Sequence, residues 1–262
     1  MGLNKSPRLA QHASAPEPSL LSVIIPALNE EENIRTSVGS ALQGRSGEQQ
    51  VEVVVADGSS SDQTAAVAKR AGAQVITASR GRGTQMNAGW RASHGQTLLF
   101  LHADSQLPMD YAALLHGALY SQPVRHGRQP ALWGCFETIQ IDSPGWQMHL
   151  LHAAVSLRTR ILHQPYGDQA IFVRANTFSA LGGYKEVPLM EDVDLVRRLR
   201  RLGPPAIIRQ PIVTSARRWQ RLGFVRTTLL NQLILVAWRL GVKEERLSAW
   251  YRSAGSKQSK RM

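Results

Sequence analysis

The stretch TLLFLHADS, at residues 97–105, decides the expected fold of this 262-residue chain. A run of apolar residues of the kind that favours β-strands leads directly into a short acidic turn that contains Asp104. In open α/β sheets, ligands bind outside the carboxyl ends of the strands, where such turns lie. An aspartate at that place can hold a divalent cation, and the cation can hold a diphosphate. The stretch therefore predicts a central strand with a ligand-binding end.

Strand and helix patterns alternate on both sides of this stretch. Short apolar runs between turn residues predict strands, while apolar residues at helical spacing and capping residues predict helices. Between residues 21 and 101 four strands alternate with three helices, which indicates a parallel, Rossmann-like sheet of the α/β class. The predicted strands are 21–26, 51–56, 73–78, 97–101, 131–141, 170–174 and two short strands in 206–215 that Pro211 separates, and the predicted helices are 30–42, 63–71, 84–93, 108–121, 146–162, 176–181, 191–202 and 223–240.

Composition is typical of a globular protein in a reducing compartment. Hydrophobic residues make up 43% of the sequence, which is enough for a sizeable core. The single cysteine, Cys135, excludes an internal disulfide framework. The first residues lack the apolar core of a signal peptide, and no apolar stretch reaches the roughly 18–20 residues of a membrane span. We therefore expect a cytoplasmic protein with a disordered leader at residues 1–19.

The positive charge is concentrated at the C-terminal end. Residues 1–196 carry 15 Lys and Arg against 17 Asp and Glu, whereas residues 197–262 carry 16 Lys and Arg against only Glu244 and Glu245. The whole formal net charge of +12 therefore comes from the last quarter of the chain. This asymmetry indicates an anionic partner, and nucleic acid, anionic lipid headgroups and a phosphorylated substrate all fit. A solvated tail is the other interpretation, and charge alone does not decide.

Acidic side chains stand at three ends of predicted elements. Taken singly, each has an ordinary explanation: Asp62 caps a helix, Asp57 belongs to a turn, and Asp194 is a solvated or ion-paired helix residue. Their order is more informative, because a nucleotide-type turn, an acidic turn after a central strand and an acidic helix start follow one another. The clusters are Asp57 with Asp62, Asp104, and Glu191 with Asp192 and Asp194.

Six short motifs support one interpretation of this order. They are VIIPALNE at 23–30, VVVADGS at 53–59, AG at 88–89, LFLHAD at 99–104, LGGY at 181–184 and MEDVD at 190–194. Each motif alone is loose, but the set resembles the family-2 nucleotide-sugar glycosyltransferases, which have the GT-A fold. The combination of HAD with GDQAIF and PLMEDVDL looks like a small soluble bacterial-type subfamily.

The resemblance implies a GT-A fold, with a mostly parallel sheet flanked by helices, and an inverting transferase. Such an enzyme moves a sugar from a nucleotide-diphosphate sugar, here a UDP-sugar, to an acceptor hydroxyl. Asp192 matches the family's catalytic base, which takes the acceptor proton, and Glu191 would orient the acceptor or Asp192. The implied cofactor is Mn²⁺ or Mg²⁺, which stabilises the departing nucleoside diphosphate as a Lewis acid.

The resemblance also assigns the nucleotide side of the site. Pro26, Glu30 and Asp57 would line the base and the ribose, with Asp57 as the acceptor for a uracil N–H. Ala56 stands where the family has the first aspartate of its usual DDGS. This departure bears on which nucleotide is bound.

Diphosphate and metal ligands are expected from two loops. Arg80 and Arg82 lie in a loop punctuated by glycines and either pair with the diphosphate or are exposed loop arginines. Asp104 matches the last residue of the family's DxD motif and would bind the metal, while His102 replaces the first aspartate. Imidazole can ligate manganese, so His102 is either a second ligand or a residue that contacts the ribose or packs at the strand end.

The acceptor side is expected from two further places. Asp168 and Gln169 lie in a GDQ sequence, where Asp168 either faces the acceptor or belongs to a loop turn. Arg218 and Trp219 resemble the QxxRW element of processive members, although Ser215 stands at the position of its glutamine. Without membrane spans, processive synthesis is not expected.

The C-terminal segment leaves alternatives open. The predicted helix at 223–240 either lies on an anionic membrane, near a lipid-linked acceptor, or packs against the sheet. A nucleotidyltransferase that uses a nucleoside triphosphate and a non-catalytic nucleic-acid-binding protein are the other functions considered. The EDVD and GGY segments favour sugar transfer, and no nucleic-acid partner is favoured. The expected divisions are 1–19 (leader), 20–222 (GT-A domain, with a nucleotide-binding half at 20–107 and an acceptor half at 108–222) and 223–262 (C-terminal helix and basic tail).

Overall fold

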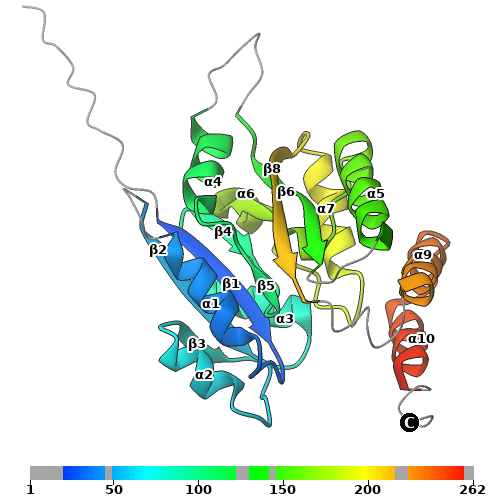
Figure 1. Cartoon of the computed structure of the whole chain (residues 1–262), viewed down its shortest axis with the longest axis horizontal. Coiled ribbons are helices and arrows are strands. Elements are labelled where there is room, and N and C mark those ends of the chain that lie inside the picture. Colours follow the sequence, from blue (N-terminus) through cyan, green and yellow to red (C-terminus); the bar gives the residue numbers. More distant parts are fainter. Residues whose placement is uncertain (1–19, 45–48, 122–129, 142–145, 216–223, 257–262) are drawn as a thin grey trace, which may run out of the picture.

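One sheet runs through the centre of the molecule and helices cover it (Figure 1). The computed structural model describes residues 20–44, 49–121, 130–141, 146–215 and 224–256. The strands are β1 (Leu21–Ala27), β2 (Val51–Asp57), β3 (Gln74–Thr77), β4 (Thr97–Phe100), β5 (Ser105–Gln106), β6 (Trp133–Ile141), β7 (Phe172–Arg174) and β8 (Ala206–Thr214). The helices are α1 (Ile34–Gln43), α2 (Thr64–Arg70), α3 (Arg82–Arg91), α4 (Tyr111–Tyr120), α5 (Trp146–Leu162), the 3₁₀ turn η1 (Gly167–Gln169), α6 (Ala175–Ala180), α7 (Glu191–Arg200), α9 (Phe224–Arg239) and α10 (Glu244–Ser256).

The strands are ordered β3-β2-β1-β4-β7-β6-β8-β5, and the first four run parallel. Ala27 pairs with Asp57, Asp57 pairs with Thr77, and Phe100 pairs with Ile24. The carboxyl ends of these strands therefore meet at one edge, where ligands bind in sheets of this kind. The predicted Rossmann-like half of the sheet is confirmed.

The other half of the sheet mixes directions. β7 is antiparallel to β4 and β6, β8 is parallel to β6, and the short β5 is antiparallel to β8. The prediction of two short strands around Pro211 is wrong, because β8 continues through this residue. Pro211 pairs with Thr138 after a register shift between Phe136 and Thr138. Such a bulge tolerates a residue that has no amide hydrogen.

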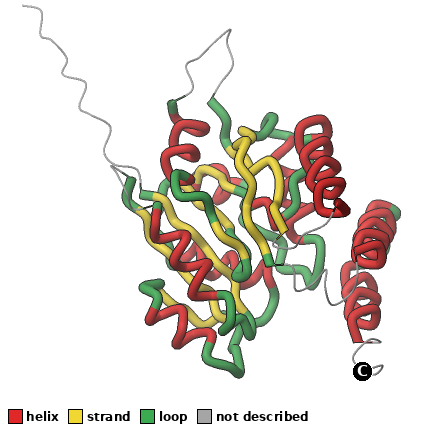
Figure 2. Tube along the Cα trace, viewed as in Figure 1, coloured by secondary structure: helices red, strands yellow, loops and turns green. Residues whose placement is uncertain are grey.

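Both faces of the sheet are buried, as Figure 2 shows by the helices on either side. Val23 and Ile25 of β1 join one apolar cluster with Tyr111 of α4, while Ile24 joins a second cluster with Phe178 of α6. Successive side chains of a strand point to opposite faces. Burial on both sides explains why these strands are uninterrupted apolar runs in the sequence.

The predicted helices form, with two notable differences. α1 begins at Ile34 rather than at residue 30, and a turn precedes it in which the amide of Asn33 donates a 3.0 Å hydrogen bond to the carbonyl of Glu30. The amide of Glu30 donates a 2.7 Å hydrogen bond to Thr64 Oγ1 at the start of α2. One helix was not predicted, because α10 (Glu244–Ser256) lies in the segment expected to be a basic tail. Leu247 of α10 is fully buried, and this contact supplies the stability that the polar sequence does not suggest.

The last two helices lie at the end of the molecule away from β3 and α2 (Figures 1 and 2). Ile234, Leu235 and Leu247 pack with Met190 in a third apolar cluster, which joins α9 and α10 to the start of α7. Within the described ranges, no helix combines the length and the apolar composition needed to cross a bilayer. The division into leader, two halves and C-terminal segment stays a prediction, and residues 1–19 lie outside the described part.

Candidate active site

A cavity of about 190 Å³ opens where the turn after β4 meets the start of α7. Side chains from α3, the β4 turn, η1 and α7 form a polar wall, and the two C-terminal helices contribute further, more apolar lining residues. The polar wall holds Arg82, His102, Asp104, Asp168, Glu191 and Asp192, and the C-terminal helices add Asn231, Ile234, Leu235 and Tyr251. Candidate residues from four separate parts of the sequence are thus brought together in one place.

Backbone hydrogen bonds hold the β4 turn in position. The amide of Ser105 donates to the carbonyl of His102 at 3.1 Å, and the amide of Ser215 donates to the carbonyl of Asp104 at 3.1 Å. The second bond ties the turn to the end of β8. The side chains of His102 and Asp104 therefore line the cavity from a backbone that neighbouring strands keep in place.

Asp192, in the first turn of α7, is oriented by two backbone amides. Its Oδ2 accepts a 2.8 Å hydrogen bond from the amide of Gly167, and its Oδ1 accepts a 2.8 Å bond from the amide of Val193. The helix begins after Met190, whose φ of 71° gives the chain the sharp entry that turns Asp192 toward η1. Two fixed donors leave the carboxylate little rotational freedom, which is what a positioned base requires.

Glu191 is the buried carboxylate of this wall. Its side chain is 3% exposed and forms an ion pair with Arg82, with 3.3 Å between Oε1 and Nε. Burial raises the pKa of Glu191; the attraction of Arg82 opposes this rise, and the nearby Asp192 adds to it. Glu191 is therefore easier to protonate than an ordinary glutamate.

Arg82 balances the negative charge of the cavity. Among the described residues that line it, Arg82 is the only Lys or Arg. The attraction of Glu191, and then of Asp192, Asp168 and Asp104, raises the pKa of Arg82 above its ordinary value despite desolvation. Its Nη1 also lies 3.5 Å from His102 Nε2. Because 42% of its side chain is exposed, water can reach this guanidinium and a ligand can as well.

Within the GDQ sequence, Asp168 and Gln169 have different surroundings. Gln169 is fully buried, where its Nε2 contacts the carbonyls of Phe136 and Glu137 at 3.0 and 2.8 Å. Its Oε1 accepts from Arg158 Nη2 at 2.7 Å and from the amide of Tyr166 at 3.1 Å. The side chain of Gln169 therefore fixes the turn and does not line the cavity, unlike its expected acceptor-side neighbour Asp168.

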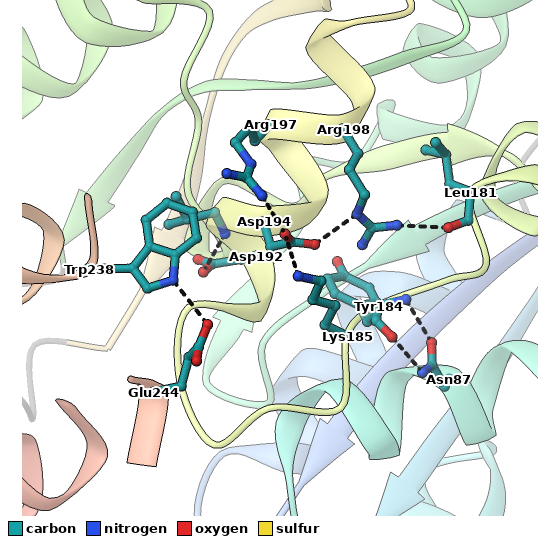
Figure 3. A network of polar contacts seen from close by, with 11 residues as sticks. Asn87, Leu181, Tyr184, Lys185, Asp192, Asp194, Arg197, Arg198, Trp238 and Glu244 are labelled. Carbon is teal, nitrogen blue, oxygen red and sulfur yellow. Dashed lines mark hydrogen bonds and ion pairs between the residues drawn. The ribbon is translucent and has the colours of Figure 1, made fainter. Parts of the chain in front are cut away.

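Asp194 belongs to a separate ionic cluster, shown in Figure 3. Its buried carboxylate pairs with Lys185 at 3.3 Å, Arg197 at 3.3 Å and Arg198 at 2.7 Å. Arg198 also donates to the carbonyl of Leu181 at 2.9 Å. Of the interpretations open to Asp194, the ion-paired one is confirmed. The cluster fixes α7 against the loop that precedes it and thereby positions Glu191 and Asp192.

The residues expected to hold the nucleotide lie at the ends of β1 and β2, outside this cavity. Asp57 is 5% exposed and accepts a 3.0 Å hydrogen bond from the amide of Ser60, so its carboxylate also stabilises its own turn. Pro26, Glu30 and Arg80 do not line the cavity either, and Arg80 is exposed. Contact of these residues with a nucleotide stays a prediction. Arg218 and Trp219 lie outside the described residues.

Two buried amides of α3 were missed by sequence reasoning. Gln85 Nε2 donates to the carbonyls of Ala27 and Ala56, both at 2.8 Å, and so ties the ends of β1 and β2 together. Asn87 exchanges two 2.9 Å hydrogen bonds with the backbone of Tyr184, as Figure 3 shows. Single amides in a helix carry no motif, which is why the sequence did not reveal them.

The donor set fits a cation that arrives with a phosphate ligand. In the part of the chain that the structure describes, no three His, Cys, Asp or Glu side chains converge as metal ligands. His102 and Asp104, however, line the cavity from one turn. Magnesium-type sites often use one or two protein ligands and complete the shell with water and substrate phosphates. The two side chains fit such a shared site and do not fit an all-protein metal cage.

Comparison with known families identifies the class. The profile described as "Glycosyl transferase family 2" matches residues 22–175, which is more than half of the chain, and the chain belongs to this family. A comparison with curated proteins gives no match.

Solved structures show the same fold. A mycobacterial protein is 23% identical with a TM-score of 0.51, over 75% of this chain and 65% of the other. S. aureus TarS 1–349 in complex with UDP is 15% identical with a TM-score of 0.56, over 74% and 60%. Glucosyl-3-phosphoglycerate synthase from Mycobacterium tuberculosis in complex with Mg²⁺ and UDP is 21% identical with a TM-score of 0.51, over 75% and 70%. The chain thus spans less than two thirds of the first two, and the expected GT-A fold is confirmed.

Proposed function

We propose that this chain is an inverting glycosyltransferase that moves a sugar from a UDP-sugar to an acceptor hydroxyl, with Asp192 as general base. The observation that carries the proposal is the position of Asp192. Two backbone amides orient its carboxylate in the same cavity that Asp104 and Arg82 line. The proposed base for the acceptor hydroxyl and the groups suited to bind a diphosphate therefore line the same cavity.

In the proposed reaction, the acceptor oxygen forms a bond to C1 of the sugar while the bond between C1 and the phosphate oxygen breaks. Asp192 takes the hydroxyl proton, and UDP leaves with the electron pair of the broken bond. This single displacement inverts the anomeric centre. Gly167 keeps the space open, since a Cβ there would lie 3.2 Å from both Asp192 Oδ2 and His102 Nε2.

Arg82 and Asp104 form the diphosphate end of the proposed site. Arg82 is anchored through Nε to Glu191, and its terminal nitrogens can donate to phosphate oxygens. Asp104, with His102, would hold Mn²⁺ or Mg²⁺ together with those oxygens, and the bound ion supplies Lewis-acid stabilisation of the leaving diphosphate. The structures of glucosyl-3-phosphoglycerate synthase with Mg²⁺ and UDP, or with Mn²⁺ and UDP-glucose, support this assignment.

UDP is the proposed nucleotide on two grounds. Both TarS and glucosyl-3-phosphoglycerate synthase have been crystallised with UDP. Asp57, at the end of β2, offers a carboxylate for the uracil N–H at the edge of the sheet where Ala27 of β1 also ends. An aspartate is an acceptor-only group when ionised, so it suits an N–H donor of the base.

Calorimetric titration of UDP with and without Mn²⁺ tests the donor site. We expect Mn²⁺-dependent binding to the wild type that is at least about tenfold weaker in Asp104→Ala. Asp110→Ala is the matched control, because Asp110 is an exposed carboxylate that contacts Gln210 outside the cavity. Equal binding by both variants, or failure of UDP, GDP and dTDP to bind the wild type, would contradict the proposal.

A further inference from the structure

α9 presents a stripe of large apolar side chains to water. Leu229, Leu233, Val236 and Leu240 are 65%, 59%, 51% and 79% exposed. Their spacing of four, three and four residues places them on one side of the helix and its end. We call these four residues the outer stripe. Single exposed apolar residues are ordinary, whereas a contiguous apolar stripe indicates a surface that contacts a partner.

The opposite side of α9 is part of the active-site cavity. Ile234 and Leu235 are 3% and 7% exposed, pack in a cluster with Met190, and line the cavity together with Asn231. One helix therefore separates the cavity from the outer stripe. Its inner side offers an apolar wall next to the proposed base, so an acceptor with an apolar part fits this space.

A second exposed apolar side belongs to α5. Leu150, Leu157 and Ile161 are 59%, 60% and 66% exposed, and their spacing of seven and four residues places them on one side of the helix. Arg239 at the end of α9 donates a 3.2 Å hydrogen bond to Gln164, just after α5 ends. One hydrogen bond thus links the end of α9 to the residue after the end of α5, and Figure 1 shows both helices at the same end of the molecule.

The positive charge around these helices indicates the kind of partner that this surface contacts. From residue 195 to residue 243 the sequence has no Asp or Glu, and α5 has none either. Arg226 and Arg239 are exposed on α9 beside the outer stripe. An apolar stripe with a basic border complements anionic lipid headgroups and the acyl region beneath them. A second copy of this chain would instead place like charges against each other.

We propose that the outer stripe of α9, with the exposed side of α5, docks on an anionic lipid bilayer, and that the acceptor is an amphiphilic alcohol that reaches Asp192 along the inner side of α9. The assignment of the acceptor rests on the proposed transferase function. The docking surface itself does not, and the two can be tested apart.

Vesicle sedimentation of the full chain tests the surface. We expect binding to phosphatidylcholine vesicles that contain phosphatidylglycerol, and weaker binding to phosphatidylcholine alone. The variant Leu229→Gln/Leu233→Gln/Val236→Gln should bind the anionic vesicles at least about tenfold more weakly. Met109→Gln is the matched control, because Met109 is 72% exposed outside α5 and α9. Titration of UDP into each protein checks that the variant keeps its fold and its donor site.

Each outcome decides for or against the proposal. Loss of vesicle binding in the triple variant alone, with UDP binding kept, supports it. Equal vesicle binding by the wild type and the triple variant overturns it, as does failure of the wild type to bind vesicles. A wild-type dimer in light scattering that the triple variant converts to a monomer, without vesicle binding, would assign the stripe to a second copy. If UDP, GDP and dTDP all fail to bind the wild type while vesicles bind, the transferase proposal fails and the docking surface stands.

Discussion

Replacing Arg82 by methionine removes the positive partner of Glu191 while it keeps most of the side-chain volume. The guanidinium Nε lies 3.3 Å from Glu191 Oε1, and the carboxylate side chain is only 3% exposed. Glu191 would then be a buried carboxylate with the negative charge of Asp192 nearby and without the positive charge of Arg82 to offset it. We expect the Arg82→Met variant to be less stable, and to be less stable by an amount that depends on pH.

The magnitude follows from the geometry of the pair. Two unit charges at this distance attract by about 5 kcal/mol at an effective dielectric constant of about 20. Because 42% of the Arg82 side chain is exposed, water screens the attraction, and the desolvation of Glu191 offsets a further part. The expected net loss in the free energy of unfolding is therefore about 1–3 kcal/mol above neutral pH.

The pH dependence has a definite sign. Burial raises the pKa of Glu191 in the folded protein, and Arg82 opposes this rise. Without Arg82 the folded-state pKa is higher still. A raised folded-state pKa gives a contribution to stability that is full below the unfolded-state pKa and is lost as the pH rises through the folded-state pKa. The loss in the free energy of unfolding of Arg82→Met, relative to the wild type, should therefore be small near pH 5 and should grow toward pH 8.

Urea denaturation of both proteins across this pH range measures the effect. Arg91→Met is the matched control, since Arg91 pairs with Glu186 at 3.9 Å and the two side chains are 63% and 45% exposed. This change should alter stability by less than about 0.5 kcal/mol at any pH. A deficit of Arg82→Met that is equal at pH 5 and pH 8, or one that Arg91→Met reproduces, would refute the reasoning.

Two further predictions concern stability. Gln169→Leu removes the hydrogen-bond acceptor of Arg158 and of the Tyr166 amide, and it should lower the free energy of unfolding by about 2–4 kcal/mol in thermal or urea denaturation. Gln106 is exposed, so Gln106→Leu should leave the stability nearly unchanged. Gly83→Ala places a Cβ 2.4 Å from the carbonyl oxygen of Lys185 and should lower the free energy of unfolding by about 1–3 kcal/mol. Gly39→Ala is the control, because nothing lies within 4 Å of its Cβ, and it should be neutral or slightly stabilising. Equal effects of the two glycine changes would contradict this packing argument.

Much of the architecture could be predicted from local pattern. The apolar runs of β1, β2 and β4 are long enough and bounded clearly enough to show buried parallel strands, and chain order then places the Asp57 and Asp104 turns at one edge. The convergence of Asp104, Asp168 and Asp192 in one cavity followed from the same logic together with the family resemblance.

Other features depend on contacts that local pattern does not encode. Gln169 looks like an acceptor-side residue in the sequence, yet its amide satisfies buried carbonyls of β6. Pro211 looks like a strand break, but a bulge accommodates it. The pairing of Arg82 with Glu191 joins residues far apart in the chain, and only the packing of α3 against α7 reveals it. The contribution of α9 to the cavity was likewise not predicted, because the sequence of this helix indicates only membrane contact or packing on the sheet.

The most direct test of the account is the anomeric configuration of the first sugar product. Proton NMR would follow the consumption of UDP-α-glucose and other UDP-α-sugars, with water or an added alcohol as acceptor, by the wild type and by Asp192→Asn. The account predicts a β-configured product from the wild type and a rate lower by a factor of about 10²–10⁴ in Asp192→Asn, with UDP binding unchanged. An α-configured product, or an Asp192→Asn variant as fast as the wild type, would contradict the assignment of Asp192 as the base of an inverting transfer.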